Sequence, residues 1–282
     1  MNVNVTTFHR WGMLGRMGAL ATLGFCAICA PASAANLQMD GVWRIEKPVF
    51  AVKTLDGKTP PLKPEAARIY AAHQSARKAG DTSFDSATWC ASVGMPRILF
   101  IDYPFQLVVR EPYVAFLHQW NWWTRIVYLD GALSDSAPAD GPPAVGRGAA
   151  PAGSGGTPPA GSARAGAPNG PPARDANKAA AGPMGLSKGR WEGDTLVIDT
   201  DTLSHLTLLD GAGLPHSQAL KITEHVSLRS PDVLVDHLRL EDPETFTAPW
   251  ETEVTYRRQR NGVIEEDVCL DRIKNHQPAV KE

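Results

Sequence analysis

The sequence predicts a mainly β fold, an antiparallel barrel or sandwich that carries one short N-terminal helix. Two observations predict it. Most of the chain divides into short segments in which apolar and polar residues alternate, as they do in half-buried strands. Turn residues separate these segments at short intervals, and helical patterns between them are rare. Strands in such a succession form antiparallel sandwiches or barrels rather than parallel sheets.

The individual elements follow from the same patterns. A helix is expected over 64–78, because Pro64 suits a first helical turn and an alanine-rich run follows it. The dipeptide Asn261-Gly262 predicts a hairpin, because both residues accept the positive φ of a type I′ turn. A region over 113–130 is long enough for two strands with a turn near Asn121. The other expected strands cover 104–110, 195–200, 219–228, 233–240, 251–258 and 263–269.

Residues 1–34 predict a secretory signal peptide. They contain two arginines and no acidic residue, and their apolar run over 17–30 is shorter than the roughly 20 residues of a membrane span. The run is followed by Pro31-Ala32-Ser33-Ala34, a small-x-small pattern that a signal peptidase accepts. We therefore expect a periplasmic or secreted protein whose mature chain begins near Ala35 and has no stable membrane insertion.

Composition and motifs exclude several classes of function. Lys and Arg number 28 and Asp and Glu 30, and no basic run occurs, so the basic surface that nucleic-acid binding requires is missing. No glycine-rich phosphate loop and no Gly-x-Ser-x-Gly motif is present, and no two histidines have a standard zinc spacing. We predict no nucleic acid partner, no cofactor and no metal, and the oligomeric state stays open.

One segment and two cysteines define the domain organisation. Residues 134–183 consist mostly of Ala, Gly, Pro, Ser and Asn without an aromatic residue, so they cannot bury enough apolar surface to become ordered. We expect a disordered insertion in a single β-rich domain formed by 35–133 and 184–282, with a domain linker as the alternative.

Cys90 and Cys269 lie on opposite sides of this segment. In an oxidising compartment they predict a disulfide, two buried thiols being the alternative.

Five motifs spread over the chain stand out. They are Cys90-x-x-x-Gly94-x-Pro96-Arg97, Gly189-Arg190-Trp191-Glu192-Gly193-Asp194-Thr195-Leu196-Val197, Pro215-His216-Ser217, Asp242-Pro243 and Pro249-Trp250. In this set the chain resembles a family of exported bacterial proteins of uncharacterised function. The resemblance implies export and a β-rich fold, and it implies no activity.

Alternation places one carboxylate on an apolar face. In the expected strand over 219–228, Glu224 has the same parity as four aliphatic residues, Leu220, Ile222, Val226 and Leu228. A carboxylate inside a core is costly unless it is paired or used for proton transfer. Glu224 is therefore either a catalytic acid or base in a barrel cavity or a structural ion pair with Arg97 or Arg125.

His118 occupies a similar position among aromatic residues. Val114, Phe116, Trp120 and Trp122 share its parity, as do Ile126 and Tyr128 if the register continues through the turn. A histidine in such a place binds a ligand or relays a proton, or is a hydrogen-bonded core residue. The aromatic cluster of Trp120, Trp122 and Trp123 lines an apolar pocket or forms ordinary core.

Three functions fit these patterns. The first is a lipocalin-like barrel that binds a small apolar or aromatic molecule. Its expected ligand-binding residues are Trp120, Trp122, Trp123, Tyr128, Arg125 and Arg97. The second is a periplasmic enzyme in which Glu224 and His118 or His225 are the acid and base. The third is a non-catalytic envelope protein that interacts with other proteins.

Overall fold

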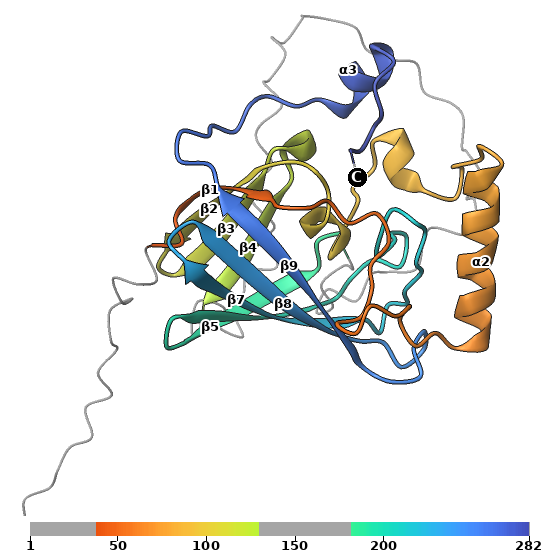
Figure 1. Cartoon of the computed structure of the whole chain (residues 1–282), viewed down its shortest axis with the longest axis horizontal. Coiled ribbons are helices and arrows are strands. Elements are labelled where there is room, and N and C mark those ends of the chain that lie inside the picture. The colour runs from red at the N-terminus through yellow and green to blue at the C-terminus, as the bar shows by residue number, and fades with distance from the viewer. Residues whose placement is uncertain (1–37, 130–181, 282) are drawn as a thin grey trace, which may run out of the picture. The chain divides into compact units, whose positions relative to one another are not determined.

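The computed structural model describes residues 38–129 and 182–281 (Figure 1). The predicted signal peptide over 1–34 and nearly all of the predicted insertion over 134–183 lie outside these described residues.

The described residues form a closed barrel of nine strands, which confirms a mainly β fold and selects the barrel over the sandwich (Figure 1). Each strand pairs with the next one in the chain, and β9 closes the barrel on β1. All pairs are antiparallel except β4 with β5, which is parallel. The strands are β1 (Gly41–Ile45), β2 (Phe105–Arg110), β3 (Tyr113–His118), β4 (Thr124–Leu129), β5 (Leu186–Glu192), β6 (Thr195–Asp201), β7 (Lys221–Ser230), β8 (Val233–Glu241) and β9 (Trp250–Arg258).

This pairing places short and long connections at opposite ends of the barrel. At one end, tight turns join β2 to β3, β5 to β6 and β7 to β8. At the other end lie the connections 46–104, 119–123, 202–220 and 242–249, and we call this end the loop end. Because loops tolerate diverse chemistry while the barrel holds them in place, the loop end is where an opening to the interior is expected.

The main helix, α2, spans Pro64–Lys78 as predicted and begins with proline in its first turn. It is tied to the loop end through His73, whose Nδ1 lies 2.7 Å from the carbonyl oxygen of Gly213. A Cβ at Gly213 would lie 2.7 Å from the His73 Cβ, so only glycine fits there. The shorter helices are η1 (Ser86–Trp89), η2 (Arg97–Leu99), η3 (Trp120–Trp122) and α3 (Cys269–Lys274). Within the described residues, none of the helices has the length and apolar character needed to cross a membrane.

The expected last strand over 263–269 is wrong, and so is the hairpin at Asn261-Gly262. Residues 263–268 contain no strand, and α3 begins at Cys269. The barrel is already closed by β9 and β1, so it offers no free edge to another strand.

The predicted disulfide between Cys90 and Cys269 is present. It has an S–S distance of 2.06 Å and joins residues 179 apart in sequence. The chain beyond β9 is also held by Asn121, whose backbone N–H donates to Asp267 Oδ2 at 2.8 Å. These contacts fasten the C-terminal segment to η1 and η3 at the loop end.

Candidate functional site

A cluster of polar side chains lies inside the barrel. We call it the interior polar cluster: Arg125 of β4, Ser187 of β5, Thr200 of β6, Glu224 of β7 and Asp236 of β8. Each is at most 2% exposed. Successive residues of a strand point to opposite faces, and these five occupy the inward positions of five consecutive strands.

Arg125 is the centre of this cluster. Its Nη1 donates to Glu224 Oε1 at 2.8 Å and its Nη2 donates to Glu224 Oε2, so the pair is bidentate. Its Nε donates to Ser187 Oγ at 3.0 Å, and Nη2 also donates to Thr200 Oγ1 at 2.8 Å. Glu224 therefore belongs to a buried ion pair. Its partner is Arg125, one of the two arginines that the sequence suggested.

Asp236 adds a second carboxyl group beside Glu224. Burial, and then the charge of Glu224 and a hydrogen bond with it, raise the pKa of Asp236 well above its ordinary value. This shift favours the neutral, protonated form of Asp236, which can donate a hydrogen bond to Glu224. Its Oδ1 is buried and has no hydrogen-bond partner within the described residues. The sequence held a signal for this residue, because Asp236 has the parity of three buried leucines, Leu234, Leu238 and Leu240.

His118 of β3 also points into the barrel. Its ring packs beside Phe105 and Phe116, with centroid distances of 5.5 Å and 6.4 Å. Burial, together with the nearby charge of Arg125, lowers the pKa of His118 to about 3. The imidazole is therefore neutral near pH 7 and cannot serve as a general acid there. Its Nε2 is buried and has no hydrogen-bond partner in the described parts of the chain.

The raised pKa of Asp236 leads to a prediction for Asp236→Asn. Between the ordinary aspartate pKa of about 3.9 and the raised folded value, the native state holds a proton that the unfolded state has lost. The unfolding free energy of the wild type therefore falls as pH rises, by up to about 1.4 kcal/mol per pH unit from this group. The asparagine keeps an N–H donor for Glu224 and has no proton to lose. Urea unfolding from pH 4 to 8 should show the variant gaining stability relative to wild type, whereas parallel curves would contradict the raised pKa.

A pocket of about 320 Å³ lies on the outer face of the barrel wall near the loop end, where outward residues such as Lys188, Asp199 and Thr223 line it. Its lining includes Leu186 at the start of β5, Lys221 at the start of β7 and Glu241 at the end of β8. Thr200, a member of the interior polar cluster, also lines it. The Thr200 hydroxyl points inward to Arg125, so the barrel wall separates this pocket from the cluster.

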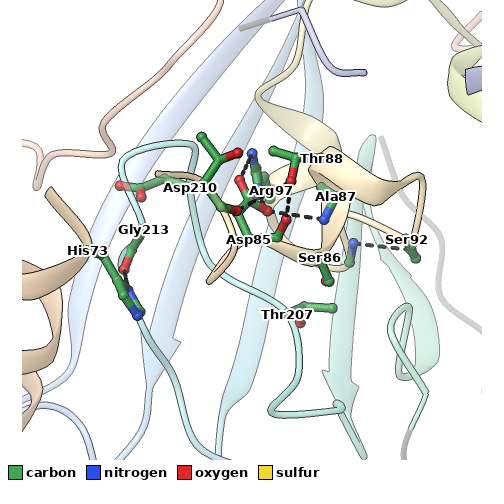
Figure 2. Close-up of polar contacts among 12 residues, drawn as sticks. His73, Asp85, Ser86, Ala87, Thr88, Ser92, Arg97, Thr207, Asp210 and Gly213 are labelled. Atoms are coloured by element: carbon green, nitrogen blue, oxygen red, sulfur yellow. Dashed lines mark hydrogen bonds and ion pairs between the residues drawn. The ribbon is translucent and has the colours of Figure 1, made fainter. Parts of the chain in front are cut away.

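Arg97, expected as a ligand-binding residue, belongs to a different polar centre (Figure 2). Its Nη1 and Nη2 donate to Asp85 Oδ1 and Oδ2 at 2.8 Å and 3.0 Å, and Arg77 of α2 donates to Oδ2 at 2.9 Å. Burial alone would raise the pKa of Asp85, but hydrogen bonds and charge from Arg97 hold it below its ordinary value. Figure 2 shows Asp210 beside this pair, where it accepts hydrogen bonds from the backbone of the loop end. These contacts join α2, η1 and η2, so Arg97 holds these elements together.

The expected aromatic residues do not gather around one cavity. Trp120 is fully buried and donates from Nε1 to the Ala279 carbonyl oxygen at 2.9 Å. Trp122 is 53% exposed, and Trp123 is half-buried. Tyr128 is half-buried on the outer face, because the register changes by one residue at η3. The expectation that Ile126 and Tyr128 share the face of His118 is therefore wrong, and Arg125 takes an inward position instead.

The three candidate acid and base residues are split between the two faces of the barrel wall. Glu224 and His118 face the interior, whereas His225, the next residue after Glu224, is exposed outside. The two neighbours therefore cannot act on the same substrate atom from β7.

The Pro215-His216-Ser217 motif contacts the Asp242-Pro243 motif at the loop end. The Ser217 backbone N–H and Oγ donate to Asp242 Oδ2 and Oδ1, both at 2.7 Å. His216 Nε2 lies 2.9 Å from Thr207 Oγ1. These bonds connect the β6–β7 and β8–β9 connections, so the motifs hold the loop end together.

None of the protein-family models, curated proteins and solved structures compared with this chain matches it, so the geometry of the barrel alone defines the candidate site.

Proposed function

We propose that the barrel binds a small uncharged molecule with an apolar or aromatic body and one polar group. The observation that carries the proposal is that two buried polar atoms of inward residues, Asp236 Oδ1 and His118 Nε2, have no hydrogen-bond partner in the described residues. Buried polar atoms are nearly always hydrogen-bonded, because leaving one unpaired costs about 1–3 kcal/mol. A ligand that supplies a hydrogen-bond donor to Asp236 would remove this cost.

The charges of the cluster favour an uncharged ligand. Arg125 is already neutralised by Glu224, His118 is neutral near pH 7, and the raised pKa of Asp236 favours its neutral form. A charged ligand would enter this interior without a free counter-ion, which is strongly unfavourable.

Aromatic rings around the cluster favour an apolar or aromatic body. Phe105 lies 5.7 Å from Phe116 and 5.0 Å from Tyr256, measured between ring centroids. At such distances the rings pack against one another, and together they give the interior an aromatic lining that a flat apolar molecule would contact.

The test uses 1-aminoanthracene, a neutral aromatic amine whose fluorescence rises in apolar surroundings. Fluorescence titration and native mass spectrometry of the mature protein should show a 1:1 complex. Asp236→Asn should bind like wild type, because the amide oxygen can still accept a hydrogen bond. Asp236→Leu removes that acceptor and should bind about tenfold more weakly, the loss expected for one hydrogen bond.

The matched control is His225→Ala, which changes only the outer face and should bind like wild type. Circular dichroism establishes that each variant is folded. A wild-type protein that binds no probe, or an Asp236→Leu variant that binds as tightly as wild type, would overturn the proposal.

The disulfide supports a second part of the proposal, namely that the protein is exported to the periplasm or secreted. Disulfides persist in oxidising compartments and are rare in the cytosol. This location agrees with what the motif resemblance implies.

A further inference from the structure

We propose that His225 and His237 together bind a divalent late transition metal ion on the outer face of the barrel. His225 of β7 lies directly opposite His237 of β8 in the strand register, and the two strands are neighbours in Figure 1. Their rings are 6.4 Å apart between centroids, at an angle of 71°. Each follows an inward carboxyl residue, Glu224 or Asp236, so both imidazoles point outward.

The spacing suits two imidazoles on one ion. A metal–nitrogen bond of about 2.0–2.1 Å places the centroids of two rings on a tetrahedral ion roughly 5 Å apart. The observed rings therefore need to close by roughly 1–1.5 Å, which side-chain rotation can supply at an exposed position. Imidazole nitrogen is a preferred ligand of Zn²⁺, Ni²⁺ and Cu²⁺, whereas Mg²⁺ prefers oxygen.

A carboxylate orients one of the two rings. His237 Nε2 lies 3.2 Å from Glu251 Oε2 on β9. If Nε2 carries the proton and donates to Glu251, Nδ1 keeps a lone pair for the ion. Metal-bound histidines commonly have this arrangement, in which the second ring nitrogen donates to a carboxylate.

The charged side chains around the two histidines are paired with one another, so they neither repel the ion nor take its place. Glu253 lies opposite His237 in the register and is paired with Arg229 at 2.9 Å, and Glu251 lies 4.0 Å from Arg239. Within residues 38–129 and 182–281 no three His, Cys, Asp or Glu side chains are arranged to hold a metal ion. The two imidazoles are therefore the protein ligands, and water would complete the coordination.

The test is calorimetric titration of Zn²⁺ and, separately, Ni²⁺ into the mature protein without a polyhistidine tag and stripped of metal by chelator. Wild type should bind one ion. His225→Ala and His237→Ala should each weaken binding on the order of 100-fold, because one ligand alone loses the gain from chelation. Mg²⁺ should show no binding.

The matched control is His205→Ala, which removes another exposed histidine whose Nδ1 lies 3.0 Å from Gln218 Nε2. It should bind Zn²⁺ like wild type. Both test positions are on the outer face, so their substitution leaves the core unchanged, and circular dichroism checks this. Absence of Zn²⁺ binding by wild type, or wild-type affinity in His225→Ala and His237→Ala, would overturn the proposal. Because the site is outside the barrel, either result is independent of ligand binding in the interior.

Discussion

Arg125→Met is expected to destabilise the protein by about 3–5 kcal/mol, as breaking a buried ion pair from one side usually does. The side chains of Arg125 and Glu224 are 1% and 0% exposed, so water cannot take the place of the lost guanidinium. The substitution also removes the hydrogen bonds that Arg125 donates to the Ser187 and Thr200 hydroxyls, which keep only the bond between each other. Urea or guanidinium unfolding measures the change in free energy.

The double variant Arg125→Met with Glu224→Met is the control for this prediction. It removes both charges and fills the space with apolar side chains, which is often neutral or stabilising for buried pairs. We expect it to recover most of the stability that Arg125→Met loses. A double variant no more stable than the single one, or a single variant that loses less than about 1 kcal/mol, would contradict the arginine-centred cluster.

The second large effect is expected from the disulfide. Replacing both Cys90 and Cys269 by alanine should cost about 2–5 kcal/mol. The bond closes a loop of 179 residues in sequence separation, and long loops gain most from a crosslink in the chain-entropy account. It also fastens the segment after β9, which contains no strand, to the loop end.

Treatment with a reductant distinguishes the effect of the crosslink on stability from the effect of the two substitutions. Wild type treated with reductant should fall to the stability of the double alanine variant, and the variant itself should not respond. Wild-type stability that is the same with and without reductant, after thiol titration has shown full reduction, would mean that the crosslink contributes nothing.

Strand alternation was sufficient to predict Glu224 as an inward residue, whereas Arg125 was one of two arginines considered as its partner on the basis of charge alone. Alternation also carried the information for Asp236, which lies among leucines of the same parity. Alternation failed for β5, because its inward residues Ser187 and Gly189 are small or polar rather than apolar. Ser187 is polar for a reason that only the closed barrel reveals: its hydroxyl accepts from Arg125.

The register change at η3 could not be read from the sequence. Asn121 and Trp122 both have positive φ, 51° and 57°, which is uncommon for residues other than glycine. This turn brings Arg125 to the inward face and moves Tyr128 outward. Parity counted from His118 therefore predicted the wrong face for β4.

Long-range contacts at the loop end were also beyond the sequence patterns. Arg97 pairs with Asp85 across 12 residues, and Ser217 with Asp242 across 25. The motifs marked these residues, but residue type and spacing could not say whether they bind a ligand or hold connections together. Likewise, the histidines at 225 and 237 have no metal-binding spacing in sequence, and only the pairing of β7 with β8 brings them together.

The crystal structure of the mature protein with 1-aminoanthracene tests ligand binding in the interior most directly. The amine nitrogen is expected within hydrogen-bond distance, about 2.7–3.2 Å, of Asp236 Oδ1, with the ring system against Phe105 and Phe116. Probe bound on the outer surface alone, or Asp236 Oδ1 hydrogen-bonded to another protein group with the interior fully packed, would contradict a ligand site inside the barrel.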